Sequence, residues 1–235
     1  MISKAFRSAL SGKLRIVQIN ETKDTHMANP FSNKKKIRGW KRRIKQIEKW
    51  KQRYIDLDME QLCRNYKDHA KLWIDPFYRL TRRNPPIWYS RLILAGMIEI
   101  YQSWSQQMQS LNEPFYLKIW LWHPNFIHSQ IVVAFREYSD YYNNTFDKSN
   151  DLKVFPSHLY KRVPGLEEFK WELAIDSVDY WLSDLQEDIG MGIRTDKDIE
   201  AIKSKAYKCE TVKTSAGNHT VYNVKVGDVW LGEIR

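Results

Sequence analysis

The chain has 235 residues, and its 38 Lys and Arg residues against 28 Asp and Glu residues give a formal net charge of +10. A hydrophobic content of 43% and an aromatic content of 14% supply enough apolar surface for a packed core, which excludes a wholly disordered protein. Two distant cysteines, Cys63 and Cys209, indicate neither a disulfide framework nor a metal site, so we expect a reduced, cytoplasmic protein.

Residues 1–33 are weakly patterned, and we expect them to form a flexible N-terminal arm. The only regular element expected there is a short strand over residues 14–19. The arm has no apolar run of the length that a secretory signal needs, so we expect no such signal.

The net charge of the chain lies in one segment, residues 34–53. This segment holds 11 cationic side chains and a single acid, Glu48, so it carries +10, while the rest of the chain is neutral. Apolar residues recur in it at steps of three and four, which predicts a basic amphipathic helix. These apolar positions are Ile37, Trp40, Ile44, Ile47, Trp50 and Tyr54. Gly39 is unfavourable inside a helix, which favours a helix start after it.

The cationic side chains of this segment are the main candidates for binding an anionic partner. We assign phosphate contacts to Lys34, Lys35, Lys36, Arg38, Lys41, Arg42, Lys45, Lys49 and Arg53, with Trp40 and Trp50 as candidates for base stacking. Three interpretations remain open: the helix lies on nucleic acid, on an anionic membrane surface, or on an acidic protein. A fourth interpretation is an ordinary core helix with a solvated charged face.

A second helix is expected from Asp58 to Trp73, because Asp58 can cap it and Asp75-Pro76 ends the apolar pattern. The link that follows carries a second cationic cluster: Arg79, Arg82 and Arg83. These arginines are further candidates for phosphate contacts, or they pair with acids such as Asp56 and Asp58. A third helix is expected over residues 87–111, and its nearly uncharged middle predicts a central core helix.

The hydrophobic period then changes from helical to alternating. Residues 115–122 and 127–135 predict an antiparallel hairpin with a turn at residues 123–126. Polar side chains interrupt this uncharged stretch, so no transmembrane span is expected. One strand face carries Trp120 and Trp122, either as a stacking platform or, as we favour, covered by another part of the fold.

The remaining sequence predicts a second set of shorter elements. Residues 138–151 are expected to form a loop, followed by a strand at 169–175 and a helix at 178–189. Thr195, with Asp198 three residues later, predicts a capped helix that continues through Ala206. Residues 209–234 predict a β-meander with turns at 215–218 and 227–228.

Together these elements predict an α+β protein. About three N-terminal helices pack on an antiparallel hairpin or sheet, and a small C-terminal α+β module ends in a β-meander. The predicted boundaries are an arm over residues 1–33, a main domain with the basic helix over 34–155, and the module over 156–235.

No sequence motif identifies an enzyme. The six histidines show no metal-ligand spacing, although His123 and His128 flank the hairpin turn, and no Gly-rich phosphate loop or hydrolase motif is present. A metal-dependent nuclease remains an alternative, with Glu168 and Lys170 joined by Asp151 or Glu137. We favour the simpler interpretation, an alternating strand with solvent-facing charges at Glu168, Lys170 and Glu172. We therefore assign no catalytic residue, metal or cofactor.

The leading expectation is a non-enzymatic nucleic-acid-binding or ribonucleoprotein accessory protein, with DNA and RNA both open. The alternatives are an adaptor that docks on an acidic protein or anionic membrane surface, and the nuclease.

Overall fold

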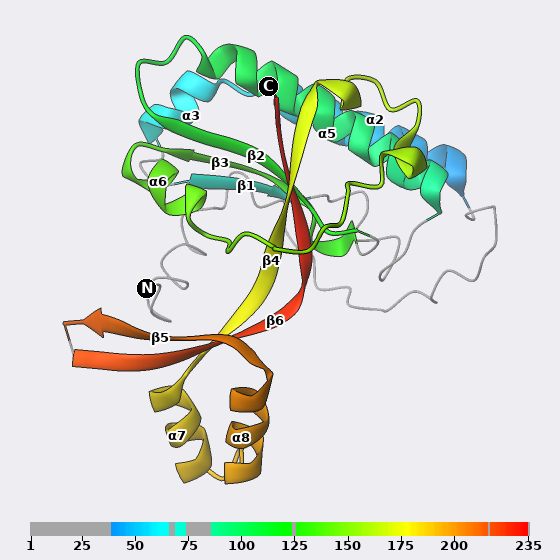
Figure 1. Ribbon diagram of the computed structural model, residues 1–235. Helices are drawn as coiled ribbons and strands as arrows, with labels where there is room; N and C mark the ends of the chain where they lie inside the picture. Colours follow the sequence, from blue (N-terminus) through cyan, green and yellow to red (C-terminus); the bar gives the residue numbers. More distant parts are fainter. Residues whose placement is uncertain (1–38, 66–68, 74–85, 124–125, 216, 235) are drawn as a thin grey trace.

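The computed structural model describes residues 39–65, 69–73, 86–123, 126–215 and 217–234, with the backbone alone for 69–73 and Ile127. The predicted α+β class is confirmed. Helices pack on an antiparallel sheet at one end of the molecule, and two long strands continue from that sheet to a smaller lobe at the other end (Figure 1). The expected arm at 1–33 lies outside the described residues.

The basic helix α2 spans Trp40–Ile55 and begins after Gly39, as the sequence favours. Gly39 has a φ of 71°, a left-handed conformation that glycine adopts without strain. Helix α3 follows over Met59–Asn65, and the carboxylate of Asp58 accepts a hydrogen bond from the Gln61 backbone N–H at 2.9 Å.

The prediction that the second helix continues to Trp73 is wrong. Residues His69–Trp73 form strand β1, which pairs antiparallel with strand β3, Gln130–Phe135. Backbone hydrogen bonds offered by a distant strand outweigh the helical spacing of apolar residues in this short segment.

Helix α5, Ile87–Met108, is the central helix of the core, as predicted. It runs parallel to α2, because the start of α2 lies near Tyr89 and its end reaches Trp104. The Trp104 indole donates a hydrogen bond to the Tyr54 carbonyl at 2.7 Å, and the Ser103 hydroxyl donates one to the Ile55 carbonyl at 2.5 Å. These two bonds satisfy backbone carbonyls at the C-terminal end of α2 and fix α2 against α5.

The predicted hairpin is confirmed as β2, Phe115–Leu121, and β3, Gln130–Phe135, joined through a short 3-10 helix, η2, at Phe126–His128. The sheet continues through β6, Gly217–Ile234, to β4, Phe169–Trp181, in the order β1-β3-β2-β6-β4. The strand β5, Ala206–Thr214, pairs with the first half of β6. Strands from both predicted domains therefore share one sheet, and the boundary near residue 155 stays a prediction.

Both faces of the β2–β3 hairpin are covered. Leu117, Ile119 and Leu121 face α5, as the alternation predicts. The opposite face, with Trp120, packs against Tyr142 and Phe146. Tyr142 belongs to α6, Glu137–Asn143, so the prediction of a loop from residue 138 is wrong over this helix. Two aromatic rings one helical turn apart, Tyr138 and Tyr142, bury this short helix on the sheet.

Two further predictions in the C-terminal part are wrong. β4 continues to Trp181, and helix α7 covers only Leu182–Gly190, because residues 177–181 pair one by one with β6. β6 is a single strand, so Gly227 and Asp228 form no turn. They lie beside a β-bulge where the register with β4 shifts between Asp176 and Ser177.

The predicted cap of helix α8, Asp196–Lys205, is confirmed. The Thr195 side chain accepts from the third backbone N–H of the helix, and the Asp198 carboxylate accepts from the Thr195 backbone N–H at 2.8 Å. The backbone and hydroxyl hydrogen bonds from Thr195 lower the pKa of Asp198. The contribution of the Asp198 carboxylate to the stability of the fold is therefore fully present above the ordinary aspartate pKa. This contribution is lost as the pH falls through the lowered pKa of Asp198.

Replacing Thr195 with alanine should remove this cap. We expect the free energy of unfolding to fall by about 1 kcal/mol at neutral pH, because a helix N-terminus loses its side-chain acceptor. Denaturant unfolding at pH 7 and again well below the ordinary aspartate pKa measures the effect. An equal loss at both pH values would contradict the role of the Asp198 carboxylate.

Candidate nucleic-acid interface

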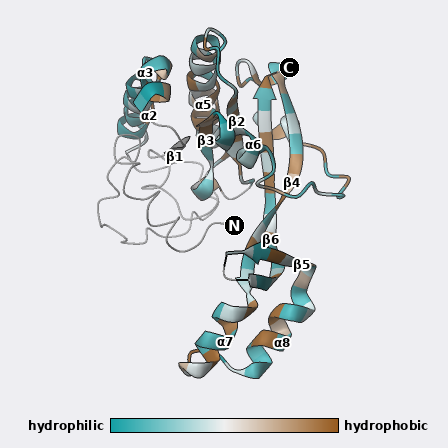
Figure 2. Cartoon of the chain, turned by 90° about the vertical axis from the view of Figure 1, so that its left-hand side faces the viewer, coloured by the Kyte–Doolittle hydropathy of each residue, from teal (hydrophilic) through white to brown (hydrophobic). Residues whose placement is uncertain are grey.

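The apolar face of α2 is anchored in the core. Ile47, Trp50 and Tyr54 are buried, and the Trp50 ring packs against Gly96 of α5. A β-carbon on Gly96 would lie 3.1 Å from the Trp50 ring, so glycine lets the two helices approach closely. Figure 2 shows α2 as mostly hydrophilic beside a more hydrophobic α5. The helix is therefore a fixed part of the body.

This anchoring removes Trp50 from the stacking candidates. Its side chain is 3% exposed, so its ring cannot reach a nucleobase while α2 stays packed on α5. Trp40 is 45% exposed, and the Lys41 ammonium lies 5.8 Å from its ring centroid. At 100° per residue, Trp40 lies about 100° outside the cationic arc, at the exposed start of the helix.

The opposite face of α2 presents a continuous row of cations. Five side chains are exposed on it: Lys41, Arg42, Lys45, Lys49 and Arg53. Helical geometry places them within an arc of about 120° and over a length of about 18 Å. None of the five forms an ion pair with a carboxylate in the part of the chain that the structure describes. The row is therefore left available for an external anion.

The other charges of α2 have partners on the side toward α5. The Lys51 ammonium lies 2.7 Å from Glu99 and 3.0 Å from Glu48, so the single acid of the helix is engaged. The hydrogen bond to Glu99 raises the pKa of Lys51 more than burial lowers it. Burial lowers the pKa of the half-buried Arg43, which lies near Tyr89. Lys51 therefore engages both Glu48 and Glu99, and neither acid forms an ion pair with the cationic row.

Several predicted contact residues lie outside the described residues. They are Lys34, Lys35, Lys36 and Arg38 before the helix, and Arg79, Arg82 and Arg83 in the link after β1. Their assignment stays a prediction, as does the alternative pairing of the arginines with Asp56 or Asp58.

The other candidate sites are not brought together. Trp120 is buried beneath Tyr142 and Phe146, so the covered-face interpretation is confirmed, although α6 supplies part of the cover in place of α5. The His123 ring forms a hydrogen bond with the Tyr160 hydroxyl at 2.7 Å, and burial lowers the pKa of His123. The His128 ring instead packs edge-on against Trp122.

The residues named for a nuclease have separate surroundings. Glu168 accepts a hydrogen bond from Gln102, and Lys170 is exposed opposite Glu233 in the β4–β6 ladder. Asp151 pairs with Lys225 at 3.2 Å, and the lysines Lys225 and Lys153 lower its pKa. Within the described ranges, no group of three His, Cys, Asp or Glu side chains has the arrangement of a metal site.

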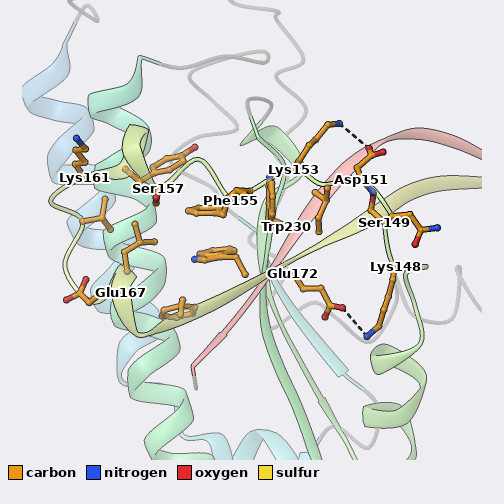
Figure 3. Close-up of a pocket in the computed structure, with 18 of the residues that line it drawn as sticks. Lys148, Ser149, Asp151, Lys153, Phe155, Ser157, Lys161, Glu167, Glu172 and Trp230 are labelled. Atoms are coloured by element: carbon orange, nitrogen blue, oxygen red, sulfur yellow. Dashed lines mark hydrogen bonds and ion pairs between the residues drawn. The ribbon is translucent and has the colours of Figure 1, made fainter.

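The structure adds a feature that the sequence pattern did not reveal. An open hollow of about 910 Å³ lies beside the first residues of β4. Its floor is aromatic: Phe155 stacks on Trp171 at 4.2 Å with an interplanar angle of 6°, and Trp230 meets Phe155 edge-on. The lining residues from 148–154 form one rim and those from 157–167 form the other (Figure 3). Only the high aromatic content of the chain gave a signal, and it did not locate the hollow.

No helix in the described residues combines the length and hydropathy needed to cross a membrane. Comparisons with known protein families, with curated proteins and with solved structures find no match to this chain.

Proposed function

We propose that this protein is a non-enzymatic nucleic-acid-binding accessory protein that holds a phosphate backbone on the exposed face of α2. The supporting observation is the row of five exposed cations on a helix whose other face is buried. Such a row supplies affinity by releasing counterions from the nucleic acid, without reading its sequence. The proposal covers both DNA and RNA.

The packing of α2 favours nucleic acid over a membrane surface. An interfacial helix binds lipid by inserting its apolar face, but Ile47, Trp50 and Tyr54 are occupied by contacts with the core. Only electrostatic attraction would remain for a membrane. An acidic protein partner is the other alternative, and the experiment below includes it.

Neutralising three cations of the row tests the proposal. The test variant combines Lys41→Gln, Lys45→Gln and Lys49→Gln, which removes charge without lowering helix propensity much. The matched control combines Lys197→Gln, Lys205→Gln and Lys213→Gln. These three lysines are exposed in the smaller lobe that contains α7, α8 and β5, called the distal lobe below (Figure 1). None of them has an ion pair within the described residues. Both variants therefore lose the same net charge.

We expect the test variant to bind a 20-base-pair duplex or a 20-nucleotide single strand roughly 10²–10³-fold more weakly at 0.1 M salt, because three phosphate contacts are lost. The control should bind within about threefold of the original protein. Equal weakening in both variants would mean that net charge alone governs binding. Tighter binding to a poly-glutamate peptide than to either nucleic acid would favour the acidic protein partner instead.

A further inference from the structure

The edge of the sheet inside the hollow carries unpaired backbone groups. β4 is the last strand of the sheet, with β6 on its inner side. On its outer side the chain covers a short part of the edge: the Ser149 N–H donates to the Leu173 carbonyl at 3.1 Å, and the Ile175 N–H donates to the Asp147 carbonyl at 2.9 Å. An isolated bridge between Lys148 and Ala174 lies between these two bonds.

The hydrogen bonds of Leu173 and Ile175 on the outer side of β4 show which way the backbone groups of the nearby residues point. Backbone N–H and C=O groups of successive residues point to opposite sides of a strand, so those of Trp171, two residues before Leu173, point outward as well. The N–H and C=O of Trp171 and the N–H of Leu173 have no hydrogen-bond partner within the described part of the chain. Trp171 and Leu173 both line the hollow, so its wall is an open strand edge.

Two aliphatic side chains stand exposed along residues 148–155: Val154, which lines the hollow, and Leu152, which lies between the lining residues Asp151 and Lys153. Leu152 is 99% exposed and Val154 is 85% exposed, whereas Lys153 between them turns toward Asp228, with its ammonium 2.6 Å from the carboxylate. Isolated exposed aliphatic residues are common, but Val154 lines the same hollow as the unpaired backbone donors and acceptors of Trp171 and Leu173. A bound chain would cover both features at once.

The charges around the hollow favour an acidic occupant. Lys148 pairs with Glu172 at 3.1 Å, and Lys153 pairs with Asp151 (Figure 3). Lys153 also pairs with Asp228. On the opposite rim, Lys161 and Arg162 are exposed and have no ion pair within the described residues, and Glu167 is the acid on that rim that lines the hollow. The unpaired charge of the lining is therefore positive.

We propose that this hollow binds an extended acidic peptide segment of a partner protein, which adds an antiparallel strand to β4 at Trp171. The added strand continues the pairing that residues 147–149 begin, so it exchanges both backbone hydrogen bonds with Trp171. Its alternate apolar side chains cover Leu152, Val154 and the aromatic floor, as in other strand-addition complexes. The edge is recessed between two rims, which admits a single extended chain and obstructs the sheet edge of a second copy.

The probe for this site is an acetylated and amidated hexapeptide of alternating glutamate and valine. We expect saturable binding, and hydrogen exchange of the Trp171 and Leu173 amides at least about tenfold slower with the peptide than in the free protein, where we expect these unpaired amides to exchange rapidly. The same peptide with N-methylated valines lacks half of the backbone donors and should give no protection. Nucleic acid is absent from this experiment, so its outcome is independent of the function proposed above.

A double variant, Leu152→Asp with Val154→Asp, should weaken peptide binding by at least about tenfold, because both side chains lose apolar contact with the peptide. Both residues are exposed, so the fold should be unaffected. Ile193→Asp is the matched control, since this side chain is 65% exposed in the distal lobe. Binding without protection at Trp171, or no saturable binding, would overturn the proposal. Protection that rises with protein concentration alone would overturn it in favour of pairing between two copies.

Discussion

Replacing Trp50 with alanine should lower the free energy of unfolding by about 4 kcal/mol, as expected for removing a buried tryptophan from a packed core. The Trp50 ring fills the contact between α2 and α5, where Gly96 leaves space for it. Chemical denaturation with a fluorescence or circular dichroism readout measures the loss. Nucleic-acid binding should fall as well, because the cationic row is oriented only while α2 remains packed.

The control for this prediction is Trp40→Ala on the same helix. Trp40 is 45% exposed, so its removal should change the free energy of unfolding by less than about 1 kcal/mol. A loss at Trp40 as large as that at Trp50 would contradict the packing of α2 described above. A small loss at both positions would mean that α2 is not anchored.

Replacing Gly232 with alanine should destabilise the protein by about 2–3 kcal/mol through overpacking. The Trp171 ring lies across Gly232 on the neighbouring strand, and an added β-carbon would lie 2.6 Å from a ring carbon. The ring has little room to move, because Phe155 stacks on it at 4.2 Å. The thermal midpoint and the near-ultraviolet circular dichroism of the tryptophans should both change.

Gly190→Ala is the matched control for this overpacking. Gly190 is the last residue of α7, and an added β-carbon there would meet no atom within 4 Å. Alanine favours the helix, so this variant should be unchanged or more stable by up to about 1 kcal/mol. If Gly232→Ala were equally well tolerated, the aromatic floor of the hollow would be looser than the structure indicates.

The elements that the sequence predicted well have strong local signals. α2 combines apolar residues at helical spacing, cations on the other face and a glycine at its start, and each of these features indicates the same boundary. The hairpin combines apolar residues at alternate positions in residues 115–122 and 127–135 with a turn signal at residues 123–126. At 100° per residue, Trp40 lies near the centre of the apolar arc and Trp50 at its edge, so helical geometry alone does not separate the two tryptophans. Trp40 is exposed because it is the first residue of α2, whereas Trp50 lies further along the helix against Gly96 of α5.

The elements that were predicted wrongly depend on partners far away in sequence. β1 is a strand because it pairs with β3, which lies about 60 residues later. Residues 178–181 have apolar side chains at helical spacing, yet their pairing with residues 221–224 keeps them in β4. The hollow likewise needs two loops and a strand edge to come together. No local period carries such long-range information.

The salt dependence of binding tests the central claim most directly, since a phosphate contact at each of the five α2 cations requires a defined slope. For a generic duplex, a plot of log affinity against log salt concentration should have a slope of about −4.5 or steeper for the original protein. The Lys41→Gln, Lys45→Gln, Lys49→Gln variant should have a slope shallower by about 2.7, and the distal-lobe control should keep the original slope. An original slope shallower than about −1, or the same slope in the test variant as in the original protein, would contradict the binding of nucleic acid by α2.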